Sequence, residues 1–393
     1  MTREASLNET PDTYAQDGVN ISVGDAFSQL AGQVCRESYM NSPYVRVTDL
    51  SRGAFRGPRG FSFQRLPDGY MVAGATDGVG TKVVLIDAAG QYFNAPSDVF
   101  AMTGMDLTRY GGLPLVFMNI LDVRSLGEKG STTFDNCCQI MRGLGELARQ
   151  YGYVLLTGET AELGLCVGSE NPDASVMFNW GGAMIGVYHP DKMILGDSLA
   201  PGQVIIALAD TFRSNGISSV RKALKQRFGD EWWKSEEPGA RDAIERCATP
   251  SVQYDRFLNR MHGWLSPERG FKPLVRMHGI VHLSGGAFES KLGHDLLAPH
   301  GLSANLHALF EPPDIMLRCA EWRGMTSAEC YRTWNGGQGA LVIVEAGDVD
   351  TFLSYAQESG IRATVAGNIE LQQEYRVALR SRFDTGGQWI TYS

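Results

Sequence analysis

The stretch Thr76-Asp-Gly-Val-Gly-Thr-Lys82 decides how the chain is interpreted, because it follows a run of small apolar residues that predicts a buried strand. Gly78 and Gly80 permit a tight turn whose backbone N–H groups approach an anion. Lys82 adds a charge suited to phosphate. Asp77 beside these donors suits Mg²⁺, which binds through carboxylates together with substrate phosphates. The alternative is an ordinary glycine turn with a solvated lysine, since the Walker A order Gly-Lys-Ser/Thr is absent here.

Composition narrows the class of protein. A chain of 393 residues predicts two or three domains. The net charge of −9 argues against a general nucleic-acid-binding surface. Seven cysteines without the spacing of a disulfide framework are typical of a reducing compartment, so we expect a cytoplasmic protein. The N-terminus is polar and the sequence has no apolar run of 18 residues. We therefore expect no signal peptide and no membrane span.

Apolar periodicity predicts alternating strands and helices, hence an α/β or α+β fold. The segment 189–202 is rich in residues that form turns, which indicates the main domain boundary. We therefore expect domains at 1–192 and 193–393. The charged segment 229–247 is predicted to lie exposed on the protein surface. We expect strands at 70–76, 115–121, 180–188, 203–209, 340–344 and 363–367, and helices at about 25–38, 96–109, 132–150, 217–228 and 348–359.

Carboxylates recur at the ends of apolar segments in the first half. Asp77, Asp106 and Glu159 each follow or end such a segment. If the three ends meet, their carboxylates form a Mg²⁺ site for a nucleotide. The alternative is that each carboxylate caps a helix or turn.

A basic, glycine-rich loop at 49–62 is either a solvated segment or a flap over phosphates. In the second half, the segments Ser214-Asn-Gly216, Ser284-Gly-Gly286 and Asn335-Gly-Gly337 share one plan, in which short polar side chains stand next to glycine at a turn. Such turns suit a phosphate or a polar small molecule, and the alternative is ordinary β-turn chemistry.

Seven motifs in order along the chain resemble the phosphoribosylformylglycinamidine cyclo-ligase (aminoimidazole ribonucleotide synthetase) family. The resemblance covers nearly the whole chain. The motifs lie at Tyr14–Asp25, Thr76–Lys82, Met105–Leu107, Gly158–Glu162, Ser214–Gly216 with Val220–Lys222, His282–Gly286 and Tyr331–Asn335.

The resemblance implies a two-domain fold: an N-terminal domain with strands that pair across a homodimer, and a C-terminal α/β domain. It implies ATP and Mg²⁺ as cofactors, and a reaction in which ATP phosphorylates the formyl oxygen of formylglycinamidine ribonucleotide before the imidazole ring closes. The implied catalytic residues are Asp77, Lys82, Asp106 and Arg213. The implied nucleotide and metal residues are Asp77, Gly78, Gly80, Thr81, Lys82, Asp106 and Glu159, and the implied substrate residues are Ser214, Asn215, Gly285, Gly286, Arg332, Thr333 and Asn335.

Two departures from the family pattern keep other functions open. Met105 stands where the family usually carries Asn, and Arg213 stands where a His usually precedes Ser-Asn-Gly. The alternatives are an ATP-dependent synthetase or kinase of the same superfamily with another amide or phosphate substrate, and a nucleotide-binding homologue that has lost catalysis.

Overall fold

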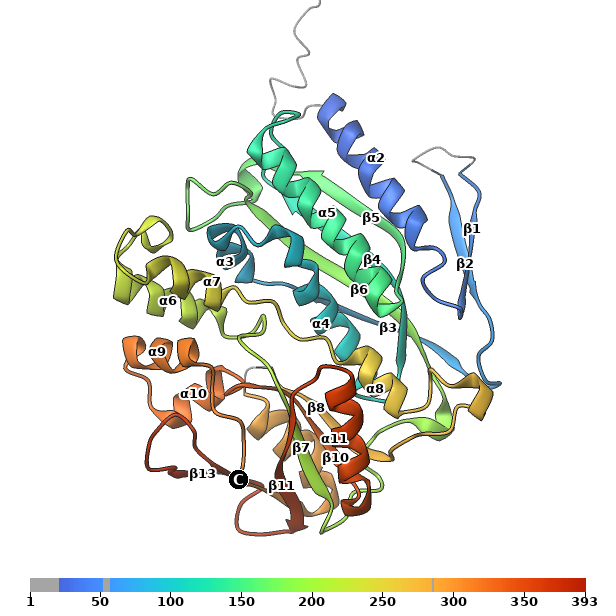
Figure 1. Cartoon of the computed structure of the whole chain (residues 1–393), viewed down its shortest axis with the longest axis vertical. Helices are drawn as coiled ribbons and strands as arrows, with labels where there is room; N and C mark the ends of the chain where they lie inside the picture. The colour runs from blue at the N-terminus through green and yellow to red at the C-terminus, as the bar shows by residue number, and fades with distance from the viewer. Residues whose placement is uncertain (1–20, 52–56, 285) are drawn as a thin grey trace, which may run out of the picture.

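The computed structural model describes residues 21–51, 57–284 and 286–393 (Figure 1). Three predicted features therefore lie wholly or partly outside the described residues: the first motif up to residue 20, the middle of the loop 49–62, and Gly285. No helix within the described ranges is long and apolar enough to cross a membrane.

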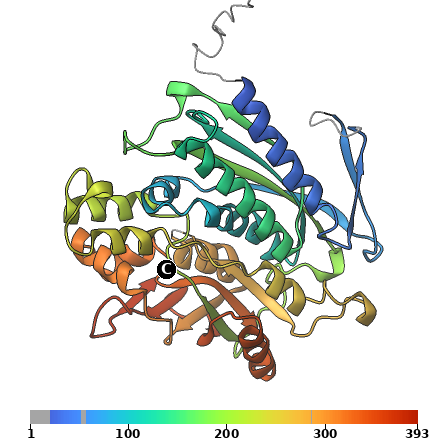
Figure 2. The same cartoon turned by 45° about the horizontal axis from the view of Figure 1, so that its top comes forward.

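The first half of the chain is built on a four-stranded mixed sheet covered on one face by helices (Figures 1 and 2). Its strand order is β3 (Met71–Gly78), β6 (Phe178–Tyr188), β4 (Leu113–Val123), β5 (Val154–Glu162). Only the β4–β5 pair is parallel, and helix α5 connects its strands as such a crossover requires. The covering helices are α2 (Ile21–Ser38), α4 (Pro96–Thr108) and α5 (Thr132–Tyr151), while β1 (Val45–Asp49) and β2 (Arg59–Phe63) form a separate hairpin.

Helix α5 shows how local sequence sets these elements. The Ser131 hydroxyl accepts a hydrogen bond from the Phe134 N–H and caps the helix, and Gly152 ends it with a positive φ of 79°. Its buried stripe includes both adjacent cysteines, Cys137 and Cys138, which pack as small apolar side chains.

The second half contains a seven-stranded sheet with both faces covered. The order is β13 (Trp389–Tyr392), β12 (Val377–Arg380), β9 (Leu302–Leu306), β11 (Ala363–Leu371), β7 (Val204–Ala209), β10 (Gln338–Val344), β8 (Met277–His282). Alternate residues of β7 enter two different cores, with Ile205 facing one and Ile206 the other. The helices of this half are α6 (Ile217–Phe228), α7 (Ala240–Cys247), α8 (Asp255–Met261), the π-helix η6 (Phe288–Leu297), α9 (Asp314–Arg323), α10 (Ser327–Thr333) and α11 (Val349–Glu358).

The hydrophobic cores are shared between the two halves. Val84 and Leu85 of helix α3 (Lys82–Ala89) pack in a core with residues of α6, α7 and α9. Met105 packs with Leu208 and its neighbours, and Trp264 packs against strand β4. The two halves are therefore not independent in their packing. The division into domains 1–192 and 193–393 stays a proposal, based on the separate tasks of nucleotide and substrate binding.

The outer face of the first sheet remains partly uncovered. Val72 is 61% exposed and Ile120 is 56% exposed, although both lie in regular strands. Met118, Ala183 and Ile185 lie on the same face. We call this surface the outer-sheet patch.

Candidate functional site

The turn at residues 76–82 lies where the two halves meet. Gly78 approaches the backbone so closely that a Cβ there would lie 3.0 Å from the Trp180 carbonyl oxygen. Gly80 has a positive φ of 61°, and a Cβ on it would lie 3.9 Å from the carbonyl oxygen of Ser214. Thr81 is exposed and precedes the first residue of α3. The turn predicted to bind phosphate thus faces the first polar turn of the second half.

Lys82 does not have the role expected from its position. Its side chain is fully buried, and its Nζ lies 2.7 Å from Asp98 Oδ1. The same ammonium donates to the carbonyl oxygens of Phe212 and Thr249, each at 2.8 Å. All three donors of the ammonium are satisfied within the protein, so no donor remains for a phosphate in this structure. We correct its role to that of a clamp between segments.

Asp77 and Asp106 lie near each other at this junction, on β3 and α4. Burial raises the pKa of Asp77, the Gly78 N–H opposes this shift at 2.7 Å, and the charge of Asp106 adds to it. Burial also disfavours ionised Asp106, but the polar His282 ring beside it and the charges of Arg109 and Lys291 outweigh burial and hold its pKa below the ordinary value. The pair therefore offers two carboxylates in a site that is partly withdrawn from water.

His282 ends strand β8 against the same carboxylate. Its Nδ1 lies 3.9 Å from Asp106 Oδ1, too far for a hydrogen bond. Burial lowers the pKa of His282 to about 3, so the ring is neutral near pH 7. Neither ring nitrogen has a hydrogen-bond partner among the described residues, although the side chain is only 1% exposed. A buried imidazole with two unsatisfied nitrogens indicates space for a ligand group.

The prediction that Glu159 joins Asp77 and Asp106 at one metal is wrong for the single chain. Asp77 lies on edge strand β3 and Glu159 on the opposite edge strand β5. Three strand spacings separate them, roughly 14 Å at about 4.8 Å each. Within the described ranges, no group of three or more His, Cys, Asp or Glu side chains is placed to hold a metal ion.

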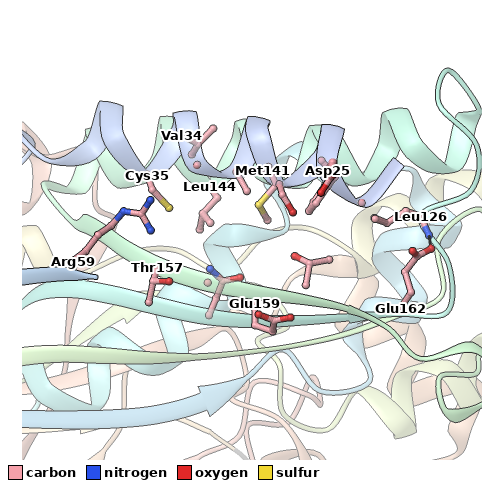
Figure 3. A pocket seen from close by; sticks show the side chains of 18 of the residues that line it. Asp25, Val34, Cys35, Arg59, Leu126, Met141, Leu144, Thr157, Glu159 and Glu162 are labelled. Atoms are coloured by element: carbon pink, nitrogen blue, oxygen red, sulfur yellow. Dashed lines mark hydrogen bonds between the residues drawn. The ribbon is translucent and has the colours of Figure 1, made fainter. Parts of the chain in front are cut away.

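Glu159 instead lines a second cavity of about 660 Å³, which we call the Glu159 cavity (Figure 3). Side chains of α2 and α5 lie opposite those of β5 across this space. Its volume lies in the range of small-molecule sites. Its polar lining includes Asp25, Arg59, Asn119, Thr157, Glu159 and Glu162.

The polar turns of the second half come together at the junction. Asn215, Ser284 and Asn335 border one small gap, too narrow for a water molecule, together with Arg213 and Trp334. Gly216 packs against the Thr333 carbonyl so tightly that a Cβ there would clash, and a Cβ on Gly286 would lie 3.8 Å from the Arg332 carbonyl oxygen. The predicted convergence of these turns is therefore present in the structure, whereas their roles in binding remain a prediction.

The side chains of these turns and their neighbours differ in how many hydrogen-bonding groups they leave free. Ser214 Oγ and Asn215 Oδ1 are buried without a hydrogen-bond partner among the described residues. Asn335 donates to the Thr211 carbonyl at 2.9 Å and accepts from the Gly337 N–H at 3.0 Å. Thr333 is half-buried and Arg332 is exposed at the end of α10. The unsatisfied pair at 214 and 215 thus provides the clearest free polar groups.

Arg213 was expected to contact a substrate phosphate, and its side chain is buried beside that of Asp210. Its guanidinium lies 2.6 Å from Asp210 Oδ2 and donates to the Ala101 carbonyl at 2.9 Å. The side chain is 1% exposed. The contact with Ala101 joins the second half to helix α4, and the role of Arg213 at a substrate phosphate stays a prediction.

The sequence interpretation missed several residues of the two sites. Lys291 and Arg109 add charge at the junction, and Asp25, Asn119 and Glu162 line the Glu159 cavity. His282 was noted in the sequence at the start of the His-Leu-Ser-Gly-Gly motif. Lys291 follows that motif by several residues, and nothing in the local pattern indicates its importance.

Comparison with known proteins agrees with this architecture. Residues 61–186 match the family described as AIR synthase related protein, N-terminal domain. The phosphoribosylformylglycinamidine cyclo-ligase of Trichlorobacter lovleyi is 29% identical over 362 residues, 91% of this chain and 95% of that protein. The enzyme of the same name from Symbiobacterium thermophilum is 30% identical over 327 residues, 81% of this chain and 84% of that protein.

Solved structures support the fold. A thiamine-monophosphate kinase from Stenotrophomonas maltophilia has a TM-score of 0.58 at 14% identity, covering 89% of this chain and 95% of that one. The hydrogenase maturation protein HypE in complex with ATP has a TM-score of 0.53 at 15% identity, covering 82% of this chain and 84% of that one.

The expected mixed α/β architecture is thus confirmed, and the fold is that of the AIR synthase-related enzymes. The homologues define the class further as an ATP-dependent ligase. The chain belongs to the phosphoribosylformylglycinamidine cyclo-ligase family. Ligase function and purine biosynthesis follow from the name that these relatives share.

Proposed function

We propose that this enzyme uses ATP to convert formylglycinamidine ribonucleotide to aminoimidazole ribonucleotide. The observation that carries the proposal is the junction itself, where the Asp77–Asp106 pair of the first half faces the polar turns of the second. One wall suits a metal-bound polyphosphate, and the other suits a polar, phosphate-bearing substrate.

The chemistry needs positioning more than it needs an enzyme nucleophile. ATP transfers its γ-phosphoryl group to the formyl oxygen, a nitrogen of the amidine attacks the formyl carbon, and phosphate leaves as the ring closes. Holding the two reacting parts of one molecule together supplies much of the rate gain. The neutral, buried His282 and the unsatisfied Ser214 and Asn215 are groups of this chain that can orient the substrate by hydrogen bonds.

The Asp77–Asp106 pair fits Mg²⁺, because this ion takes one or two protein carboxylates and fills its remaining positions with phosphate oxygens and water. One oxygen of Asp77 is engaged by the Gly78 N–H, and Asp106 is 30% exposed. Both would hold the ion, which when bound supplies positive charge to the phosphates of ATP. We assign Glu159 to the separate cavity and propose that the cavity serves another part of the nucleotide.

The two departures from the family pattern that kept other functions open, Met105 and Arg213, differ in their surroundings. Met105 is fully buried in the core that contains Leu208, and the Arg213 side chain is locked by Asp210. Met105 is not placed to recognise a substrate, whereas Arg213 borders the same gap as Asn215, Ser284 and Asn335, and its Nε has no hydrogen-bond partner among the described residues. The Met105 replacement therefore gives no reason to assign another substrate or a loss of catalysis, and the assay below decides the question for Arg213.

ADP release tests the proposal directly. We expect the enzyme to release ADP from Mg²⁺-ATP only when formylglycinamidine ribonucleotide is added, with aminoimidazole ribonucleotide formed in equal amount. A coupled ADP assay and chromatography of the product measure both. ADP release with another amide or phosphate substrate, and none with this one, identifies a different synthetase or kinase; ATP binding without turnover identifies a lapsed homologue.

We further propose a homodimer in which a second copy covers the outer-sheet patch. Sedimentation at micromolar concentration is expected to give twice the mass of the chain. Ile120→Asp should shift the species toward monomer, because it places a charge on an apolar face. Leu371→Asp is the matched control, since Leu371 is 68% exposed but lies at the end of β11 in the second half. A wild-type monomer refutes the dimer.

The cysteines agree with the proposed cytoplasmic location, because all seven are free thiols in the structure.

A further inference from the structure

Lys291 places an ammonium group between the two walls of the junction. It lies on η6, and its Nζ donates to Ser284 Oγ at 2.7 Å. Its charge favours the ionised forms of both Asp77 and Asp106, so it lies within electrostatic reach of the carboxylate pair across the junction. π-helical turns are rare and occur frequently at functional sites.

The bonding of Lys291 differs from that of Lys82. Lys82 has three acceptors, whereas Ser284 is the only hydrogen-bond acceptor that the described residues give Lys291. No carboxylate in the described ranges lies within 4.0 Å of its Nζ. Burial, then the charge of Arg109, lowers the pKa of Lys291, so holding this cation here costs free energy. Donors left free on a half-buried ammonium indicate an anionic ligand.

A second observation points to the same ligand. His282 faces the carboxylate pair from the end of β8, is 1% exposed, and has two ring nitrogens without partners among the described residues. A group that reaches Asp106 between these side chains satisfies His282 and Lys291 together. Phosphate oxygens suit both, since they accept hydrogen bonds from a neutral imidazole N–H and from an ammonium.

We propose that Lys291 binds a phosphate oxygen at the Asp77–Asp106 pair, the contact that the sequence interpretation assigned to Lys82. The inference rests on the proposed function. The phosphate belongs either to ATP or to the ribonucleotide, and the two sources share the same chemistry. Lys291 is therefore a binding residue for the phosphoryl-transfer step, reaching the ligand from the second half.

Calorimetric titration of the full chain tests this inference with three ligands: Mg²⁺-ATP, AMP and aminoimidazole ribonucleotide. Lys291→Met removes the charge but keeps much of the side-chain volume. We expect about tenfold to a hundredfold weaker binding of the ligand whose phosphate it contacts, as for the loss of a hydrogen bond to a charged group. Lys291→Arg should recover most of the affinity, because it retains the positive charge.

Two controls separate binding from folding. Lys272→Met makes the same change at an exposed lysine of the second half and should leave all affinities within twofold. Thermal unfolding without ligand identifies a variant that is merely unfolded; in that case Lys291→Gln, which keeps a polar side chain, replaces the methionine variant.

Weaker ATP binding with unchanged AMP binding supports the inference and identifies ATP as the phosphate source. Weaker ribonucleotide binding alone supports it with the ribonucleotide as the source. Unchanged affinity for Mg²⁺-ATP and for aminoimidazole ribonucleotide in folded Lys291→Met overturns the inference and leaves the proposed function standing. A wild-type protein that does not bind Mg²⁺-ATP overturns both.

Discussion

Asp77→Asn is expected to abolish Mg²⁺-dependent ATP binding while the protein remains folded. Asparagine keeps the size of the side chain but removes the negative charge that a divalent cation requires. The loss should exceed about a hundredfold in affinity, because removing even a group that supports a metal ligand costs about 10–100-fold. The fold should survive, since Asp77 makes no ion pair within the described ranges and its short bond is to the adjacent Gly78 N–H.

Calorimetry with and without Mg²⁺ measures this effect. Asp68→Asn is the matched control, because Asp68 is exposed just before the same strand and should behave as wild type. Glu159→Gln should retain Mg²⁺ dependence, since Glu159 lies on the other edge of the sheet. Unchanged ATP affinity in Asp77→Asn would refute the metal site. Loss of Mg²⁺ dependence in Glu159→Gln would show that Glu159 belongs to the same metal site as Asp77.

Lys82→Met is expected to lower the free energy of unfolding by about 3–5 kcal/mol, the usual cost of removing one partner of a buried ion pair. Asp98 would remain as a buried charge, with its Oδ2 already lacking a partner among the described residues. The carbonyls of Phe212 and Thr249 would also lose their donor. The clamp joins α4 to two segments of the second half, so its loss should lower the free energy of unfolding of the whole chain.

Urea unfolding without ligand measures this loss. Lys225→Met is the control, since Lys225 forms an exposed pair with Asp230 and should cost less than about 1 kcal/mol. Adding Asp98→Asn to Lys82→Met should recover part of the stability, because it removes the uncompensated charge. If Lys82→Met keeps wild-type stability but loses ATP affinity, Lys82 binds phosphate as the sequence first indicated.

Regular patterns of short range predicted much of the fold. The run before Asp77 forms β3, and the periodic segment at 132–150 forms α5 to within a residue. Glycine next to short polar residues correctly predicted the turns at 214 and 335, because those turns depend on local backbone freedom. Strong local preference and long apolar periodicity are the features that a sequence displays directly.

The errors arose where partners lie far apart in sequence. Lys82 is buried because its acceptors come from residues 98, 212 and 249. Glu159 is separated from Asp77 because the strand order places β6 and β4 between them. The segment 229–247, expected on the surface from its charges, contains fully buried Trp232 and the helix α7, whose apolar side packs in a core with α6 and α9.

The shared cores also determine how the enzyme can open for its ligands. A hinge between 1–192 and 193–393 would pull Val84 and Leu85 out of one core, Met105 out of another and Trp264 out of a third. Such a swing exposes several large apolar side chains at once, at about 1.5–3 kcal/mol each. We therefore expect ligands to enter without separation of the two halves. For the same reason, neither half should be a stable fragment when it is expressed alone.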